Sequence, residues 1–355
     1  MKLEQLGFTH RIRNLANLTS DDESEIGRVI VEHKERYIIQ SVEGSFNAEI
    51  TGNLRFSAQS RHDYPAVGDW VKIATVDAES AVILEILPRT SVLERQAVGQ
   101  YGEAQIIATN IDHAFIVQAV GHDFNLKRLE RYLTICHTAQ IEPIVLLTKI
   151  DLAEKDAVSQ LINQLHQRTK GIPVIAISSE TGVGYEQLEE IMHPHQSYCF
   201  LGSSGVGKSS IVNRLNGQSI LKTSTISDST NKGRHTTSHR ELLVLPNESI
   251  VIDTPGMREV GMTDQVPGLE QTYDEITELA QQCKFNNCDH THEQGCAVIA
   301  AVNAGDISEE AYQNYLKLKR EQQHFSSTVR EKRQKSRAQG KLYKAIQNEK
   351  RKNKY

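Results

Sequence analysis

Residues 25–95 contain short runs in which apolar and polar positions alternate. Gly, Asp, Asn and Pro interrupt the runs, and the four clearest are 26–40, 46–57, 68–76 and 80–87. Alternation with a period of two is typical of strands that have one buried face. Short strands this closely spaced predict a small β-barrel. The first candidate is the oligonucleotide/oligosaccharide-binding (OB) barrel and the second is an SH3-like barrel, because spacing alone does not separate the two.

Beyond residue 110 the pattern changes to buried strands that alternate with amphipathic helices. Strands are expected in the apolar runs 113–120, 142–151, 172–178 and 197–202. The helices expected between and after them are 125–140, 153–170, 185–192 and one that begins at Lys208. Two further strands are expected at 240–246 and 249–256. This alternation predicts a parallel sheet covered by helices.

These changes of pattern divide the chain of 355 residues into three predicted domains, a number that its length allows. They are 1–99, a barrel with an N-terminal extension; 100–262, an α/β domain; and 263–355, a polar helical domain. The predicted fold class is therefore multidomain α/β. Residues 95–110, at the first boundary, are expected to form a linker or a loop.

The composition is ordinary for a globular protein, with 38% hydrophobic and 24% charged residues. No run approaches the roughly 18 consecutive apolar positions of a membrane span, and the first 25 residues lack the apolar centre of a secretion signal. We therefore expect a cytoplasmic protein without a membrane partner.

The net charge of −5 hides a strong asymmetry along the chain. Residues 317–355 hold 14 Lys and Arg against three Glu, a charge of +11, so the rest of the chain carries −16. A basic tail on an acidic body favours a polyanionic partner, because neutralised phosphates release condensed counterions. A solvated basic helix without a partner is the alternative that charge alone leaves open.

A phosphate-binding loop is predicted at residues 202–209, GSSGVGKS, which follow an expected strand and open an expected helix. The glycines let backbone N–H groups close around phosphates, and the helix N-terminus adds partial positive charge. In this pattern Lys208 reaches the β- and γ-phosphates, and the Ser209 hydroxyl binds Mg²⁺.

Residues further along fit the remaining parts of a magnesium–triphosphate site. Asp253 ends an expected strand in VIDTPG and would hold Mg²⁺ through water, while the N–H of Gly256 would meet the γ-phosphate. Between the loop and this strand, Thr236 and Thr237 lie in NKGRHTTSH, a switch-like segment that offers hydroxyl groups to the metal.

The residues that would read the base come before the phosphate loop. Asp151, in VLLTKIDL, ends an apolar strand and can accept hydrogen bonds from the N1–H and the 2-amino group of guanine, a pair that adenine does not offer. Lys149 would lie along the ring, and the ISSETG segment from Ser178 would offer N–H groups to the guanine O6. Ligands of an open α/β sheet gather at the carboxyl ends of its strands, so a circular permutation preserves such a site.

Three of the five cysteines lie in the segment CKFNNCDHTHEQGC, which argues for a metal site rather than a disulfide framework. Cys283, Cys288 and Cys296 supply three thiolates, and His290 or its rival His292 supplies an imidazole. This set suits one structural Zn²⁺ with four protein ligands and no open position for catalysis.

With TKID, GSSGVGKSS, GRHTT, DTPG and the cysteine cluster in this order after a β-rich N-terminus, the chain resembles the circularly permuted ribosome small subunit-dependent GTPases (RsgA, also called YjeQ). The resemblance covers nearly the whole chain. It implies an OB-type barrel, a permuted P-loop GTPase domain and a C-terminal zinc-binding domain with a basic helical tail. It also implies hydrolysis of GTP to GDP and phosphate, stimulated by the small ribosomal subunit, in late maturation of that subunit.

The partners implied by the resemblance are the small ribosomal subunit and its rRNA, contacted by barrel and tail, and we expect a monomer. The implied cofactors are GTP or GDP, Mg²⁺ and one Zn²⁺, for which the family pattern favours His290. The residues expected to contact the nucleotide or its Mg²⁺ are Thr148, Lys149, Ile150, Asp151, Ser178, Ser179, Gly202, Ser203, Ser204, Gly205, Val206, Gly207, Lys208, Ser209, Ser210, Thr236, Thr237, Asp253 and Gly256.

Two positions depart from familiar GTPase patterns. Thr148 stands where the NKxD pattern has Asn, so we expect modest nucleotide affinity. Met257 follows the switch glycine, where Ras-type GTPases orient the attacking water with Gln. His235 is the best polar substitute, as a water-positioning group or general base, and a surface histidine without such a role is the alternative. The expected catalytic residues are His235, Lys208 and Thr237.

Two other classes of function remain open from the sequence. One is a nucleotide-gated RNA-binding module whose hydrolysis is incidental, and stimulation of turnover by small subunits would argue against it. The other is a small-molecule kinase or ATPase with the same phosphate loop. Lys149 and Asp151 argue against this second class, because the pair is suited to guanine.

Overall fold

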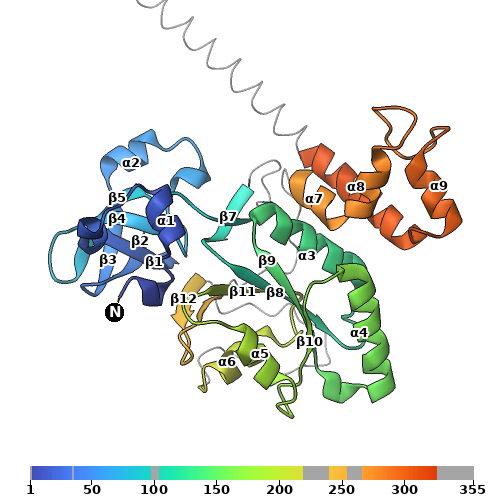
Figure 1. Ribbon diagram of the computed structural model, residues 1–355. Coiled ribbons are helices and arrows are strands. Elements are labelled where there is room, and N and C mark those ends of the chain that lie inside the picture. The colour runs from blue at the N-terminus through green and yellow to red at the C-terminus, as the bar shows by residue number, and fades with distance from the viewer. Residues whose placement is uncertain (1, 34–35, 97–103, 219–239, 254–265, 326–355) are drawn as a thin grey trace, which may run out of the picture. The chain divides into compact units, whose positions relative to one another are not determined.

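The computed structural model describes residues 2–33, 36–96, 104–218, 240–253 and 266–325. The chain forms two compact units, 1–94 with 106–260 and 95–105 with 261–355. The first unit holds a β-barrel and an α/β sheet, and the second holds a helical domain with the cysteine cluster (Figure 1).

The N-terminal strands close into a five-stranded barrel. They are β1 (Ile26–His33), β2 (Arg36–Ser41), β3 (Ser45–Ile50), β4 (Trp70–Thr75) and β5 (Ser80–Ile86). The strand order is β1-β2-β3-β5-β4, and β4 also pairs with β1, which closes the barrel. The β3–β5 pair is parallel and the other pairs are antiparallel. The predicted OB-type barrel is confirmed, with Val29, Ile39 and Ile83 among the residues that fill it.

Short helices precede the barrel and cover one part of it. They are a 3₁₀ turn (Glu4–Leu6), α1 (His10–Leu15) and a second 3₁₀ turn (Ser20–Glu25). Their apolar side chains form a small core around Trp70, which is fully buried and meets the ring of Phe8 edge-on. The N-terminal extension is thereby attached to the barrel.

The strand predicted over residues 46–57 is wrong in its second half. β3 ends at Ile50, and Gly52–Ser57 form helix α2. The Thr51 hydroxyl accepts a hydrogen bond from the N–H of Leu54 at 3.2 Å and so caps this helix. A local cap therefore decides the conformation of a segment whose apolar alternation favours a strand.

The second part of this unit is a six-stranded sheet in the order β10-β9-β8-β11-β13-β12. Its strands are β8 (His113–Ala119), β9 (Glu142–Thr148), β10 (Val174–Ala176), β11 (Ser197–Leu201), β12 (Arg240–Val244) and β13 (Ile250–Asp253). All neighbours are parallel except β12, which runs antiparallel to β13. The predicted parallel sheet is confirmed.

Helices cover both faces of this sheet (Figure 1). The helices α3 (Leu126–Ala139) and α4 (Lys155–Thr169) pack on one face, against residues that include Ala114 and Ile116 of β8. The helices α5 (Tyr185–Ile191) and α6 (Lys208–Leu215) pack on the other, against Phe115 and Val117 of the same strand. Neighbouring residues of β8 thus face opposite helical layers. Because both faces of this strand are buried, its sequence is a continuous apolar run.

The linker predicted at residues 95–110 is wrong in part. Residues Val92–Gln96 form β6 and Ala104–Thr109 form β7, and these two strands make a separate sheet. The Arg95 guanidinium donates to the Gln105 side-chain oxygen at 3.1 and 3.2 Å across the pair. A two-stranded ladder therefore lies where polarity alone predicted a loop.

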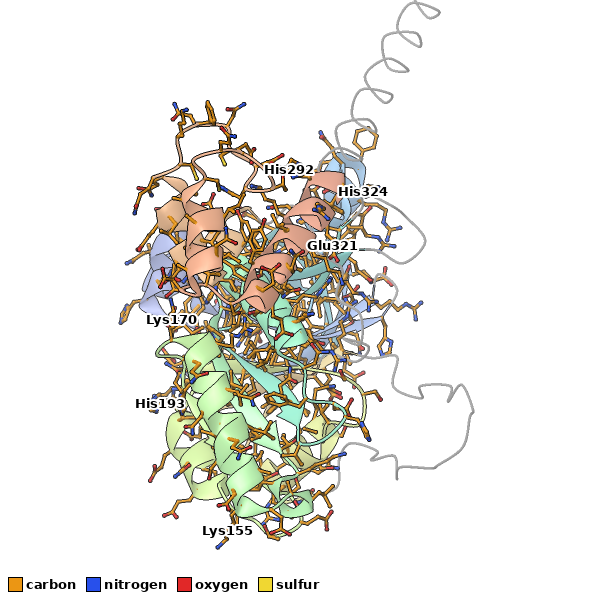
Figure 2. All side chains as sticks on the ribbon, turned by 90° about the vertical axis from the view of Figure 1, so that its right-hand side faces the viewer. Lys155, Lys170, His193, His292, Glu321 and His324 are labelled. Atoms are coloured by element: carbon orange, nitrogen blue, oxygen red, sulfur yellow. The ribbon has the colours of Figure 1, made fainter. Side chains whose placement is uncertain are left out.

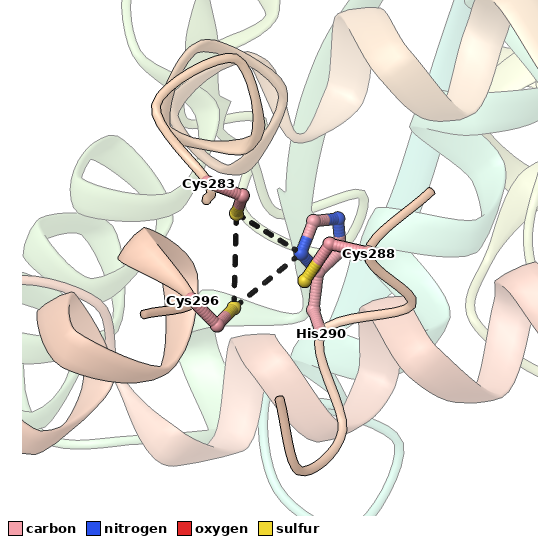
Figure 3. Close-up of side chains that lie close together, drawn as sticks. All are labelled: Cys283, Cys288, His290 and Cys296. Atoms are coloured by element: carbon pink, nitrogen blue, oxygen red, sulfur yellow. Dashed lines mark hydrogen bonds between the residues drawn. The ribbon is translucent and has the colours of Figure 1, made fainter. Parts of the chain in front are cut away.

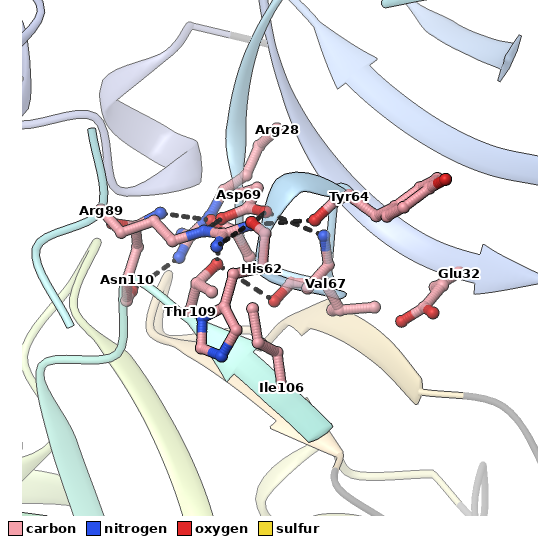
Figure 4. Close-up of polar contacts among 12 residues, drawn as sticks. Arg28, Glu32, His62, Tyr64, Val67, Asp69, Arg89, Ile106, Thr109 and Asn110 are labelled. Carbon is pink, nitrogen blue, oxygen red and sulfur yellow. Dashed lines mark hydrogen bonds and ion pairs between the residues drawn. The ribbon is translucent and has the colours of Figure 1, made fainter. Parts of the chain in front are cut away.

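Buried polar groups join the barrel to the sheet (Figure 4). Asp69 is fully buried and accepts two hydrogen bonds from Arg89 and one from the Thr109 hydroxyl, at 2.6–2.8 Å. Arg28, 1% exposed, donates to the backbone carbonyls of Leu6, Gly68 and Asn110. Burial lowers the pKa of Arg28 to about 10, so it remains charged at neutral pH. Breaking a buried pair such as Asp69–Arg89 costs about 3–5 kcal/mol. The hydrogen bonds from Thr109 to Asp69 and from Arg28 to Asn110 tie the two parts into one unit.

The C-terminal unit contains α7 (Val266–Thr272), α8 (Asp274–Ala280), α9 (Ala297–Ala304) and a further helical segment at 309–325. Its small core includes Leu269, Ile276, Val298 and Leu318. No helix in the described segments of the chain combines the length and the apolar character needed to cross a bilayer.

Candidate nucleotide site and metal centre

The phosphate loop follows β11 and opens α6, as the sequence predicts. Gly202, Gly205 and Gly207 have φ angles of 155°, 83° and 102°, which only glycine adopts without strain. A Cβ atom on Gly202 would lie 2.6 Å from the carbonyl oxygen of Val117 on β8. The first glycine of the loop is therefore required by both its backbone angle and the closeness of the neighbouring strand.

Lys208 folds back over this loop. Its Nζ atom donates to the backbone carbonyls of Gly202 and Ser203 at 2.6 and 2.5 Å. Ser209 and Ser210 follow in the first turn of α6, where free backbone N–H groups and the helix dipole favour an anion. The loop thus places an ammonium group at the helix N-terminus, the arrangement that phosphate binding needs.

The predicted base-reading strand, β9, is attached to the phosphate loop. The hydroxyl of Thr148, which is 2% exposed, donates to the backbone carbonyl of Val206 at 2.7 Å. Lys149 follows with a left-handed φ of 58°, and Ile150 and Asp151 begin a 3₁₀ turn. A hydrogen bond therefore brings together two motifs that are 58 residues apart along the chain.

The Ser178 segment lies beside Asp151. The buried Ser178 hydroxyl donates to a carboxylate oxygen of Asp151 at 2.5 Å and accepts from the N–H of Thr181 at 3.1 Å. The Ser179 carbonyl accepts from Arg214 of α6 at 2.7 Å. These bonds orient the carboxylate and fix the backbone of the segment from which N–H groups are expected to reach a guanine.

Asp253 is the last residue of β13, next to the phosphate-loop strand. It lies one position beyond Ile252, which pairs with Cys199 of β11. Its carboxylate therefore belongs to the end of the sheet from which the loop emerges. The other predicted residues, His235, Thr236, Thr237 and Gly256, lie outside the described residues.

Two further side chains of this region were missed by the sequence interpretation. Arg128, in the first turn of α3, donates to the hydroxyl of Ser203 in the phosphate loop. Gln118 of β8 accepts the N–H of Asn125 at 3.0 Å through its side-chain oxygen. In the sequence, Asn125 and Arg128 look like the ordinary start of a helix. The one sequence signal for their place near the phosphate loop was that this helix cap follows a buried strand.

The four predicted metal ligands lie together in the C-terminal unit (Figure 3). Their ligand atoms are all within 4.8 Å of one another. The His290 Nδ1 is 3.6 Å from the Cys283 sulfur and 3.5 Å from the Cys296 sulfur, and these two sulfurs are 3.8 Å apart. His292 is exposed and is not part of the cluster (Figure 2).

These separations fit zinc. A tetrahedral ion with Zn–S bonds of ~2.3 Å and a Zn–N bond of ~2.0–2.1 Å sets sulfurs ~3.8 Å apart and each sulfur ~3.6 Å from the nitrogen. The His290 carbonyl accepts from the Tyr312 hydroxyl at 2.5 Å, and the Cys296 sulfur accepts from the N–H of Ile299 at 3.5 Å. Second contacts of this kind hold ligands in place.

Comparison with known protein families matches residues 86–263 to the model described as RsgA GTPase. The matched stretch contains the predicted base-reading strand, the phosphate loop and Asp253. The chain belongs to the RsgA GTPase family. It is a GTP-hydrolysing enzyme with a guanine nucleotide as its ligand, and the predicted family resemblance is confirmed.

Curated relatives of this RsgA-family GTPase match almost from end to end. A protein from Lactiplantibacillus plantarum named small ribosomal subunit biogenesis GTPase RsgA 2 is 44% identical over 90% of this chain and 89% of its own length. A relative of the same name from Vibrio vulnificus is 38% identical over 99% of this chain and 96% of its own.

Solved structures agree with the fold. The crystal structure of YjeQ from Thermotoga maritima has a TM-score of 0.65 and 25% sequence identity, and the match covers 84% of this chain and 98% of that one. YloQ, described as a circularly permuted GTPase, has a TM-score of 0.60 at 24% identity over 86% and 95% of the two chains. The predicted combination of barrel, permuted GTPase sheet and C-terminal helical domain is thereby confirmed.

Proposed function

We propose that this RsgA-family GTPase acts late in the maturation of the small ribosomal subunit and hydrolyses GTP faster when it is bound to that subunit. The names of the relatives that match over most of the chain support this role. The observation that carries the nucleotide part is the Thr148–Val206 hydrogen bond, because it joins the guanine-reading strand to the phosphate loop in one site.

The test is GTP turnover by the full chain with and without purified small ribosomal subunits. We expect the subunits to raise the turnover rate strongly, and large subunits serve as the matched control. An equal rate with and without small subunits would favour a nucleotide-gated RNA-binding module instead. If unlabelled GTP competes with labelled GTP for binding and unlabelled ATP does not, a kinase or ATPase is excluded.

Each site residue has a proposed role. The phosphate loop and Lys208 would hold the β- and γ-phosphates, and Asp151 would select guanine, with Ser178 orienting its carboxylate. His235 would position or activate the attacking water, and Thr237 would complete the catalytic set together with Lys208. The remaining proposed nucleotide contacts are Thr148, Lys149, Ile150, Ser179, Ser203, Ser204, Val206, Ser210, Gly202, Gly205, Gly207 and Gly256.

Two metal ions are proposed. Mg²⁺ would be held by the Ser209 hydroxyl, by Asp253 through water and by Thr236 or Thr237, and when bound it neutralises phosphate charge. Zn²⁺ would be held by the cluster of Cys283, Cys288, His290 and Cys296 as a structural ion, since four protein ligands leave no position for a substrate.

The proposed division of labour follows the three predicted domains. Residues 1–99 and the basic end of 263–355 would contact rRNA, while 100–262 would bind and hydrolyse GTP. We further propose a monomeric enzyme that works in the cytoplasm, where the subunits it acts on are assembled.

A further inference from the structure

Arg128 and Lys208 approach the same residue of the phosphate loop. The guanidinium of Arg128 donates to the hydroxyl of Ser203, whereas the ammonium group of Lys208 donates to the carbonyl of Ser203 at 2.5 Å. Among the described residues, the Arg128 side chain has one other partner, the carbonyl of Asp123 at 3.5 Å, which is a weak contact. Two cations thus converge on the second position of the loop.

A ring of hydrogen bonds holds Arg128 in this place. The N–H of Arg128 donates to the Asn125 side chain at 2.9 Å, and the N–H of Asn125 donates to the Gln118 side chain at 3.0 Å. The Thr148 hydroxyl, whose single proton is donated to the carbonyl of Val206 at 2.7 Å, lies 3.3 Å from the carbonyl oxygen of Gln118. Thr148 in turn reaches Val206, so the ring begins and ends in the phosphate loop.

The charge of Arg128 is not neutralised by a carboxylate in the part of the chain that the structure describes, where no ion pair includes it. Arginine stays protonated at any physiological pH, and its planar fork suits phosphate oxygens. Two cations beside a phosphate loop suit a multiply charged anion better than either cation alone would.

We propose that Arg128 is a catalytic arginine supplied from within the chain, which contacts the γ-phosphate and stabilises the charge that develops during hydrolysis. In that step the oxygen of water forms a bond to the γ-phosphorus, and the bond from this phosphorus to the β–γ bridging oxygen breaks. The bridging oxygen keeps the electron pair and leaves with GDP, while the water protons pass to phosphate and solvent. Negative charge therefore grows between the β- and γ-phosphates, where arginines raise the hydrolysis rates of other P-loop GTPases.

The Arg128 side chain already lies at the loop that would hold the phosphates. Its donor already contacts Ser203, the residue after the first glycine of the loop, and α3 is fixed by the ring described above. Preorganised donors of this kind cost little reorganisation at the moment of reaction.

The experiment compares Arg128→Ala, Arg128→Lys and the native full chain with Mg²⁺ present. Single-turnover hydrolysis of GTP should slow about 100-fold in Arg128→Ala, while the Kd for a fluorescent GTP analogue should change less than about fivefold. Arg128→Lys should slow hydrolysis at least about tenfold, because an ammonium group lacks the two-pronged geometry. The variants should also lose the tight binding of GDP with aluminium fluoride, which mimics the transferred phosphoryl group.

Lys127→Ala is the matched control, an exposed cation in the same helical turn, and should hydrolyse GTP at the native rate. A native rate in Arg128→Ala would overturn the proposal. So would a rate loss matched by an equal loss of GTP affinity, because the arginine would then act in binding only. If Arg128→Ala does not fold, Arg128→Lys decides, and a native rate with native aluminium fluoride binding would refute the assignment.

Discussion

The Thr148 hydroxyl lies between β8 and the phosphate loop, and it donates to the loop at the carbonyl of Val206. An Asn at this position has both a donor and an acceptor, whereas a hydroxyl has a single proton to donate. One such net hydrogen bond contributes about 1 kcal/mol. Threonine therefore keeps the connection between base reader and loop with fewer bonds, and modest nucleotide affinity remains a prediction.

Asp151 is the residue that should decide which base is bound. Asp151→Asn replaces one acceptor oxygen with a donor that faces the N1–H and 2-amino group of guanine. We expect GTP affinity to fall about 100-fold and xanthosine triphosphate to bind instead, since xanthine offers a carbonyl at the 2-position. Calorimetric titration of both nucleotides measures this exchange.

Asp156→Asn, an exposed carboxylate in the first turn of α4, is the matched control and should leave GTP binding unchanged. If Asp151→Asn binds GTP as tightly as the native chain, Asp151 does not read the base.

His235 is the proposed water-positioning group because Met257 offers no suitable hydrogen bond to water. We expect His235→Ala to lower subunit-stimulated GTP turnover at least about 100-fold while the Kd for GTP stays the same. Turnover in the presence of small subunits and titration with a fluorescent analogue separate the two quantities. His193→Ala, an exposed histidine of the same unit, should turn over normally (Figure 2), and unchanged turnover in His235→Ala would remove His235 from the mechanism.

Individual elements show where periodicity succeeds and where it fails. α3, α4 and the strands β8, β9 and β11 lie where apolar periodicity predicts them, because each has a continuous buried face. The α2 segment fails because its six residues are too few to establish a period, and the Thr51 cap decides instead. The strand β7 was missed because its partner β6 lies on the other side of a polar stretch.

The C-terminal unit should depend on its metal. Its core is small, so a bound ion supplies part of its folding free energy. Cys288→Ser should lower the zinc content below one ion per chain. It should also lower the melting temperature of the C-terminal unit, measured in the full chain. Elemental analysis together with calorimetry provides the measurement.

His292→Ala removes the exposed neighbouring imidazole and should keep one zinc ion and the native melting temperature. Full zinc content in Cys288→Ser, or loss of zinc in His292→Ala, would contradict the ligand set described for the cluster.

At the scale of the whole molecule, the permutation leaves the binding edge intact. β11 carries the phosphate loop and lies between β8 and β13, although the chain reaches β8 and β9 long before β11. Parallel strands end at the same edge, so Asp151, the loop and Asp253 meet there regardless of chain order. β12, the last strand in the order of the six-stranded sheet, pairs with β1 and so joins the sheet to the barrel.

The basic tail should act in subunit binding rather than in the chemistry. The helical segment 309–325 contributes Leu316, Leu318 and Phe325 to buried positions, so a chain that ends after Phe325 keeps these side chains. Residues 326–355 hold 11 Lys and Arg against two Glu. Their removal should weaken small-subunit binding and flatten its dependence on salt, because fewer counterions are released.

Intrinsic GTP turnover of the shortened chain should match that of the full chain. A variant in which these basic residues are replaced by Gln is the control for length. Native affinity and a native salt slope after truncation would show that the tail does not contact the subunit.

The sequence by itself determined which residues form the candidate site, because the loop glycines, Lys208, Asp151 and the predicted metal ligands are each a particular residue type at a short spacing. It also determined most elements, since periodicity is a local property. Tertiary structure decided what local spacing cannot encode: the β1–β4 pair that closes the barrel, the buried Asp69–Arg89 pair and the approach of Arg128 to Ser203. Those contacts join residues 20 to 75 positions apart, and only the burial of apolar surface across the whole unit brings them together.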